Sequence, residues 1–242
     1  MEHIIGKSTE LRESRHEHWV SMSDLMAGLM MVFLLIAIAY MRFIHVQKQE
    51  IEKIAYAYRN TNVAIYNALR TEFSADLERW KAQIDENELS FEFTSDEASF
   101  ASASVKLRPE FELVIAEFFP AYVRVLGNFK ADIQEVRIEG HTSSEWTGSN
   151  DPDQSYFLNM ALSQGRTREV LQFAYTLEAI APEREWIKEK FAAVGFSSSH
   201  PVLVDGIESR EKSRRVRFTV ITNAETKIGE ILNRSRRDAS AR

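Results

Sequence analysis

The longest apolar run of the chain extends from Leu25 to Met41 and contains no charged residue. An α-helix rises about 1.5 Å per residue, so the stretch from Trp19 to Tyr40 measures roughly 33 Å, close to the ~30 Å hydrocarbon core of a bilayer. Trp19 and Tyr40 also stand where interfacial aromatic residues are common. The pattern predicts one transmembrane helix over residues 19–44. A secretory signal peptide is the alternative, but no small-x-small cleavage site follows the run.

Residues 45–88 follow a helical pattern, because they contain neither Pro nor Gly and are rich in Glu, Lys, Gln and Ala. They predict a helical connector. Apolar residues recur in it at seven-residue intervals, which indicates two copies of the chain side by side. An amphipathic helix packed on its own domain explains the same pattern. The residues in question are Ile44, Ile51, Tyr58 and Ile65, with Ile54 and Ala68 in the companion position.

From Leu89 onwards short strand-like segments alternate with helical ones. Pro109 stands at the first turn of an expected helix and is followed by acidic residues, as helix starts favour. The alternation predicts an α+β fold class, with an α/β sandwich over residues 89–222 in which helices cover a sheet. The expected elements are strands at 89–93, 136–139, 191–196 and 216–221, helices from 109 and over 158–176, and a C-terminal tail at 223–242.

Charge and composition exclude several functions. The 242 residues carry 30 basic and 36 acidic side chains, a net charge of −6, which argues against nucleic acid as a partner. The absence of cysteine excludes disulfides, Cys-ligated zinc and thiol catalysis. The sequence also lacks a Gly-rich phosphate loop and the common hydrolase motifs, so we expect neither an enzyme nor a metal site. Asp151 and Asp153 could offer oxygen ligands to Ca²⁺, but a turn explains them better.

Asp24 stands near the beginning of the predicted span. A carboxylate within a bilayer costs several kcal/mol unless it is neutralised, hydrated or paired, so it indicates function by default. Ala27 and Gly28 lie on the same helix face and would let another helix approach closely. We therefore expect Asp24 to face protein and to take up and release a proton. In the alternative interpretation, Asp24 lies at the membrane interface and caps the N-terminus of the helix.

The stretch from Trp19 through Ser-Met-Ser-Asp24-Leu-Met-Ala-Gly to the following apolar residues resembles the transmembrane helix of the MotB family of ion-driven motor proteins. The resemblance covers about twenty residues. It implies that Asp24 is the ion-binding residue, with H⁺ or Na⁺ as the transported ion and no further cofactor.

Residues 89–222 resemble the OmpA-like peptidoglycan-binding domain in three motifs: V-R-I-E-G-H-T at 136–142, N-x-x-L-S-x-x-R at 159–166, and S-R-R-V-R-F at 213–218. The resemblance implies that Arg166 binds the diaminopimelate carboxylate of the peptidoglycan stem peptide, for which a guanidinium fork is well suited. The chain departs from the family at Ser143, where an Asp is usual, and in a longer segment before Asn159. The expected binding residues are His141, Thr142, Ser143, Asn159, Leu162, Ser163, Arg166 and Arg215.

Three basic residues precede the span and three follow it closely, so charge alone leaves the orientation open. Because peptidoglycan lies outside the inner membrane, we expect residues 1–18 in the cytoplasm and the C-terminal domain in the periplasm. The chain resembles the ZorB family of MotB-like subunits in Zorya anti-phage defence. The features that carry this resemblance are the segment G-H-T-S-S-E-W at 140–146, the short N-terminal tail, the span and the compact total length. This resemblance implies a homodimer inside a pentamer of the membrane protein ZorA. A flagellar MotB-type stator subunit and a passive wall anchor without ion flux remain alternatives.

Overall fold

The computed structural model describes residues 5–94, 99–101 and 103–223, with side chains for all of these except 5–21 and 53–59. The chain divides into two units, Met1–Ile54 and Ala55–Arg242. Helix α1 extends from Ile5 to Phe73. The predicted tail at 223–242 lies outside the described residues except for Asn223.

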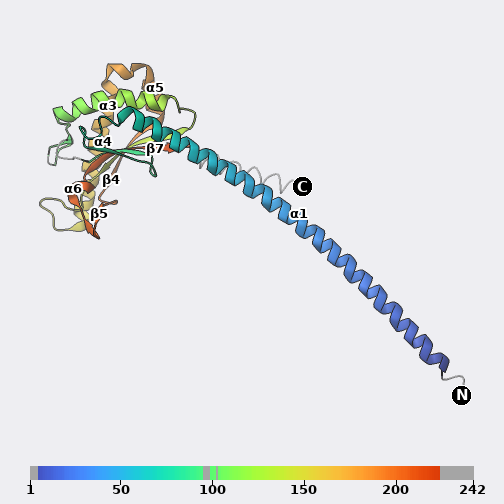
Figure 1. Cartoon of the computed structure of the whole chain (residues 1–242). Helices are drawn as coiled ribbons and strands as arrows, with labels where there is room; N and C mark the ends of the chain where they lie inside the picture. Colours follow the sequence, from blue (N-terminus) through green and yellow to red (C-terminus); the bar gives the residue numbers. More distant parts are fainter. Residues whose placement is uncertain (1–4, 95–98, 102, 224–242) are drawn as a thin grey trace. The chain divides into compact units, whose positions relative to one another are not determined.

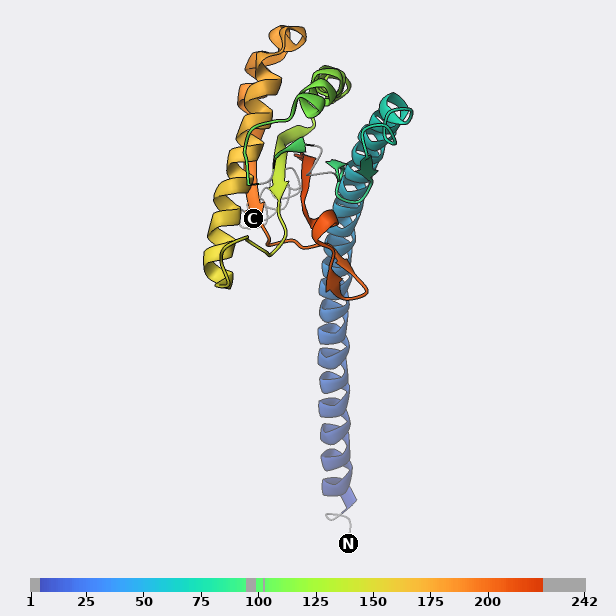
Figure 2. The same ribbon diagram turned by 90° about the vertical axis from the view of Figure 1, so that its left-hand side faces the viewer.

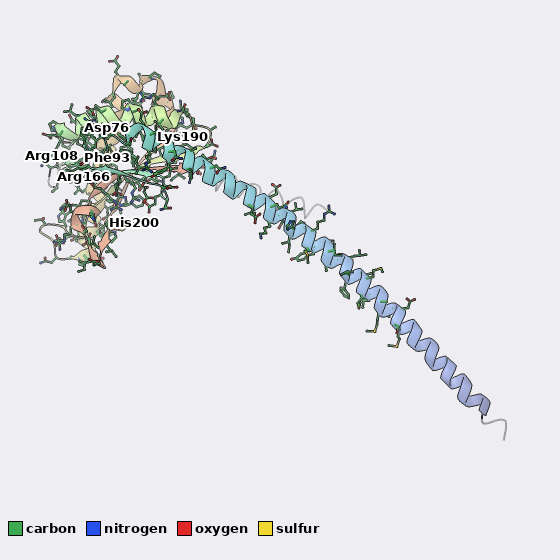
Figure 3. The ribbon with its side chains drawn as sticks, in the orientation of Figure 1. Asp76, Phe93, Arg108, Arg166, Lys190 and His200 are labelled. Carbon is green, nitrogen blue, oxygen red and sulfur yellow. The ribbon has the colours of Figure 1, made fainter. Side chains whose placement is uncertain are left out.

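The first unit presents an apolar helix surface. Within the described residues, α1 contains the one stretch that is long and apolar enough to cross a membrane, Met22–Glu52. Every side chain from Met22 to Val46 is exposed, including Leu25 and Ile36, and Figure 3 shows the side chains along this part of α1 as sticks. A contiguous apolar surface of this size requires lipid or another protein as cover.

Asp24 lies within this helix and not at its beginning. Since α1 begins at Ile5, the backbone amides that follow Asp24 bond to carbonyl groups of the preceding helical turn. They are not the unsatisfied amides of a helix N-terminus. The interpretation of Asp24 as an N-cap is therefore wrong.

The second unit contains a five-stranded sheet, which confirms the α+β class. Its strand order is β1-β2-β7-β3-β4, and only the β3–β4 pair is parallel among these neighbours. Figure 1 shows the sheet with its helices. The strands are β1 (Ala82–Asp85), β2 (Ser90–Phe93), β3 (Ile133–His141), β4 (Phe191–Ser197) and β7 (Arg215–Thr222).

Two longer helices cover the sheet, α3 (Pro109–Gly127) and α4 (Pro152–Thr176). In Figure 2, α4 runs alongside the strands. The expected helix start at Pro109 is confirmed, and α4 begins earlier than expected because Asp151 caps it, its side chain accepting a hydrogen bond from the backbone N of Asp153 at 3.0 Å. The remaining elements are η1 (Glu178–Glu183), α5 (Arg184–Lys190), the hairpin β5 (Leu203–Val204) and β6 (Ile207–Glu208), and α6 (Arg210–Ser213).

The core is a cluster of aromatic rings between α3 and the sheet. The ring centroid of Phe118 on α3 lies 4.5 Å from that of Phe91 and 5.1 Å from those of Phe93 and Phe218. Phe73, the last residue of α1, lies 5.3 Å from both Phe91 and Phe118. The end of α1 is therefore part of the domain core.

This arrangement differs from the expected helical connector. The helix ends at Phe73, and strand β1 occupies residues that were expected to be helical. Ile65, one of the residues recurring at seven-residue intervals, is fully buried in the core of the second unit, whereas Ile44 and Ile51 are exposed. At Ile65, packing on the chain's own domain explains the apolar pattern. The paired-helix prediction now concerns only the part of α1 before the core.

Two glycines let α4 approach the sheet closely. A Cβ atom on Gly140 of β3 would lie 2.8 Å from the backbone O of Ser163, and one on Gly195 of β4 would lie 2.5 Å from the backbone N of Gln164. Real Cβ atoms do not come this near to backbone atoms. The glycine of the Gly140-His141-Thr142 motif is thus required by the packing of α4 on β3.

Candidate functional site

A pocket of about 150 Å³ opens where β3 ends beside α4. Sites for drug-sized ligands measure roughly 300–1,000 Å³, so this one has room for one end of a larger ligand. Five of the eight predicted binding residues line it: Thr142, Ser143, Asn159, Leu162 and Arg166. The sequence prediction missed the other lining residues, Ala103, Glu145, Trp146, Thr147 and Arg214.

Arg166 lines the pocket and is held there by three contacts of its guanidinium group. Its Nε donates a hydrogen bond to the carbonyl of Ser104 at 2.9 Å, and Nη2 donates to that of Ala101 at 3.4 Å. The guanidinium carbon stands 4.7 Å above the centroid of the Phe100 ring. Only 5% of the residue is exposed. A guanidinium positioned in this way is pre-organised to bind a carboxylate.

Asn159 and Ser163 position the surroundings of the pocket. The side-chain amide of Asn159 donates to the backbone carbonyls of Ser143 and Glu145, both at 3.1 Å, and so holds the loop that follows β3. Ser163 Oγ accepts a hydrogen bond from the backbone N of Ser197 at 3.1 Å, which joins α4 to the end of β4. Ser163 does not line the pocket, and its contacts make it a structural residue.

Thr142 offers the pocket a polar group. Its backbone N donates to the carbonyl of Ser197 at 2.9 Å. Its side-chain hydroxyl is buried and has no hydrogen-bond partner among the described residues, although the residue lines the pocket. A buried hydroxyl without a partner has a cost that a polar ligand atom would remove.

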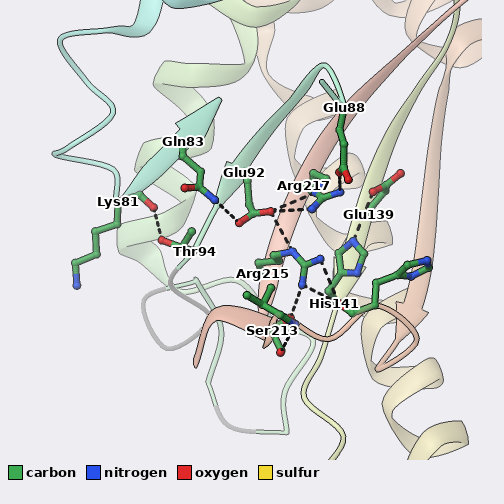
Figure 4. A network of polar contacts seen from close by, with 12 residues as sticks. Lys81, Gln83, Glu88, Glu92, Thr94, Glu139, His141, Ser213, Arg215 and Arg217 are labelled. Atoms are coloured by element: carbon green, nitrogen blue, oxygen red, sulfur yellow. Dashed lines mark hydrogen bonds and ion pairs between the residues drawn. The ribbon is translucent and has the colours of Figure 1, made fainter. Parts of the chain in front are cut away.

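Two consecutive arginines stand at the start of β7. Arg214, directly before the strand, lines the pocket, whereas Arg215, its first residue, does not. Successive side chains of an extended chain point to opposite sides, so the two cannot face the same site. Arg215 Nε lies 3.0 Å from Glu92 Oε2, and its Nη1 donates to the carbonyl of Ser213 at 3.0 Å (Figure 4). The structure thus brings Arg214, which the sequence analysis did not select, to the pocket.

Arg215 belongs to a network of charges on the face of the sheet that points away from α4 (Figure 4). Glu92 also pairs with Arg217, whose Nη2 lies 3.1 Å from the same carboxylate oxygen, and Arg217 pairs in turn with Glu88. Burial lowers the pKa of Arg215, and the carboxylate of Glu92 opposes that effect. The network ties β2 to β7.

His141 lies on the same face as this network, opposite Arg215 in the β3–β7 register. Its ring stacks on Phe196, with centroids 5.3 Å apart, and its Nε2 lies 3.5 Å from Glu139 Oε2. Burial lowers the pKa of His141, and the contact with Glu139 opposes this only in part. Although burial by itself raises the pKa of Glu139, the neighbouring His141 and the nearby positive charges bring it below its ordinary value. Neither residue lines the pocket.

Asp24, the predicted ion-binding residue, lies in the other unit and is exposed along with its apolar neighbours. A Cβ atom added to Gly28 would meet no atom within 4 Å, so this helix surface has room for a close neighbour. Among the described residues, no group of three or more His, Cys, Asp or Glu side chains could hold a metal ion.

No family model matches the chain. Similar solved structures include a MotB-like protein from Desulfovibrio vulgaris (22% identity, 68% of this chain and 96% of that chain, TM-score 0.49). Another is the cell wall anchor of the T6SS from Pseudomonas aeruginosa (21% identity, 64% and 96%, TM-score 0.45). In sequence, the chain is 52% identical over 233 residues to the Zorya protein ZorB of Escherichia coli (Crooks strain), covering 96% of this chain and 99% of the relative. With more than half of the residues identical over almost the full length of both proteins, the resemblance noted from the motifs is confirmed, and the chain belongs to the ZorB family.

Proposed function

We propose that this chain is the wall-anchored subunit of an ion-driven rotary motor in the inner membrane, and that the motor acts in anti-phage defence. The observation that carries the proposal is an aspartate inside an apolar helix whose side chains, from Met22 to Val46, are all exposed. The chain's membership of the ZorB family supports the role in defence.

Asp24 is the ion carrier in this proposal. A carboxylate in the bilayer must be neutralised, and uptake of a proton or Na⁺ does so reversibly. Each elementary charge that crosses the membrane supplies about 2.3 kcal/mol per 100 mV, which is enough to bias a two-state step. Two copies of the chain form the fixed centre, and a pentamer of ZorA-like subunits moves around them. The small residues Ala27 and Gly28 beside Asp24 support such a close approach.

The pocket of the second unit is the anchor. Arg166, held by two backbone carbonyls and the Phe100 ring, binds the diaminopimelate carboxylate of a peptidoglycan stem peptide. Arg214 adds a second guanidinium group to the lining of the pocket. Because peptidoglycan lies outside the inner membrane, this unit is periplasmic and residues 1–18 are cytoplasmic. The role is non-catalytic.

Replacement of Asp24 tests the motor. Asp24→Asn keeps the size of the side chain and removes its titration, so we expect loss of phage protection at unchanged membrane levels, measured as plating efficiency beside an immunoblot. Asp24→Glu, which keeps a titratable carboxylate, is the matched control for charge and should retain part of the protection. Full phage protection by Asp24→Asn would contradict the motor and support the passive-anchor alternative.

Replacement of Arg166 tests the anchor. The full chain in detergent is sedimented with purified peptidoglycan sacculi. Loss of a hydrogen-bonded charged contact costs about 1.5–3 kcal/mol, so Arg166→Ala should weaken binding about tenfold or more. Arg168→Ala is the matched control, because Arg168 is an exposed arginine on the same helix that does not line the pocket. Thermal unfolding followed by circular dichroism checks that both variants are folded, and equal sedimentation of the two would remove Arg166 as the clamp.

A further inference from the structure

Among the described residues that line the pocket, one is acidic, Glu145, and it accompanies the two guanidinium groups of Arg166 and Arg214. A ligand that carried only negative charge would meet repulsion from this carboxylate. Charges of both signs in one small pocket instead match a ligand that carries both. Glu145 follows Ser143 by two residues, in the loop between β3 and α4.

The backbone around Glu145 is fixed from two sides. Its carbonyl accepts a hydrogen bond from the side chain of Asn159 at 3.1 Å. The backbone N of the preceding residue, Ser144, donates to the carboxylate of Glu208 at 2.9 Å, and the Ser144 hydroxyl contacts the same group. Glu208 belongs to β6, so the hairpin holds this loop against the pocket. The loop therefore does not depend on the Glu145 side chain for its position.

The Glu145 side chain itself pairs with Arg210, the first residue of α6. The two side chains are 56% and 59% exposed, respectively. Ion pairs as exposed as this are weak, because water solvates both partners well when they separate. The carboxylate can thus exchange Arg210 for another cation without a large loss.

We propose that Glu145 binds the ammonium group of the ligand whose carboxylate Arg166 binds, and that Arg210 is an internal competitor for Glu145. The inference rests on the proposed wall-binding function and specifies its ligand as a group with an amine and a carboxylate close together. When the ligand enters, its ammonium replaces the Arg210 guanidinium at Glu145. Ligand binding therefore frees Arg210 and loosens its contact with the loop.

A purely structural role for the pair makes a different prediction. If Glu145 and Arg210 only fastened the loop, removing either would weaken binding to a similar degree. In the competitor arrangement the two substitutions act in opposite directions, because one removes the ammonium site and the other removes its rival.

The experiment measures the dissociation constant of the full chain in detergent by calorimetry with two probes. One is N-acetyl-L-Ala-D-Glu-meso-diaminopimelate, and the other is the same peptide acetylated on its remaining amine. For the first probe, Glu145→Gln should weaken binding about two- to fivefold, since it removes the charge of an exposed carboxylate. Arg210→Gln should tighten it about two- to fivefold, the range of an exposed ion pair. Neither substitution should change affinity for the second probe, and Glu211→Gln, an exposed neighbour outside the pocket, should change neither.

The inference is overturned if Glu145→Gln binds the first probe as the unaltered chain does, if both substitutions weaken it alike, or if the loss is equal for the second probe. These results differ from a failure of the proposed function. In that case the unaltered chain would bind neither the first probe nor sacculi, and Arg166→Ala would change nothing.

Discussion

Helix α1 contains two apolar stretches with opposite surroundings. Leu29 is 55% exposed, whereas Leu69 on the same helix is completely buried. Leu69 is covered by its own domain, together with Ile65 and Phe73. Leu29 and its neighbours have no such cover from the described residues of the isolated chain, so lipid or other subunits must supply it. Apolar composition alone does not distinguish a membrane segment from a core segment, because the difference lies in what the rest of the chain provides.

The largest effect should come from removing the buried stretch. A fragment that begins at Leu89 lacks Ile65, Leu69, Phe73 and strand β1, and each buried side chain contributes about 1.5–3 kcal/mol. Their sum approaches the 5–15 kcal/mol that stabilise an ordinary domain. We expect no cooperative thermal transition by circular dichroism for residues 89–242, and a clear one for residues 55–242. Equal melting of both fragments would contradict the assignment of these residues to the core.

A single substitution in each stretch sharpens the contrast. Phe73→Ala should lower the free energy of unfolding of the domain by about 3–5 kcal/mol, as is usual for a buried phenylalanine. Phe33→Ala changes the same residue type where it is exposed, and it should leave the domain transition unchanged. Both are measured by denaturant unfolding of the full chain in detergent. A similar loss in the two variants would mean that the two stretches are equally buried.

A smaller effect on stability is expected from overpacking the contact between α4 and β4. Gly195→Ala adds a methyl group 2.5 Å from the backbone N of Gln164, and overpacking of this kind costs about 1–3 kcal/mol. Gly127→Ala is the control, because its Cβ would meet nothing nearer than Lys130 Cε at 3.9 Å. The melting temperature should fall only for Gly195→Ala. An unchanged value would show that α4 can move away from β4.

The smallest effect is expected from the buried imidazole of His141, through the pH dependence of stability. Because burial lowers the pKa of His141 below its ordinary value of 6.5, the unfolded chain binds the proton more readily than the folded one. The contribution of His141 to stability is complete above pH 6.5 and declines as the pH falls below it. His141→Gln should flatten the pH dependence of the melting temperature in that range. Glu139, whose pKa is lowered, changes stability with pH only below its ordinary pKa of 4.5, so it does not contribute in the range of His141. An unchanged pH profile in His141→Gln would contradict the burial of a neutral His141.

The sequence predicted the elements of the domain better than their ends. The apolar run, the strand alternation and Pro109 were sufficient for the candidate membrane helix, the main strands and the start of α3. The end of α1 was missed because no Pro or Gly follows Phe73, and the turn before β1 is made by Lys81, which adopts a positive φ of 50°. A change of direction made by a non-glycine residue leaves no compositional signal.

The candidate pocket shows a similar limit. The resemblance to the OmpA-like domain predicted five lining residues, which lie on one helix face and on the segment that directly follows β3. It selected Arg215 in place of Arg214, since a run of two arginines does not reveal which one faces the helices until the strand register is known. Glu145 was missed as a lining residue because its position depends on a loop held by Asn159 and Glu208, which are distant in sequence.

The ring contacts of Phe73 have a mechanical consequence. A force along the last turns of α1 is transmitted through Phe73 to Phe91 of the sheet and Phe118 of α3, without a flexible linker in between. A tether of disordered residues would absorb the first displacement by straightening. Here the domain resists the force from the first displacement, until the contacts of the aromatic cluster break.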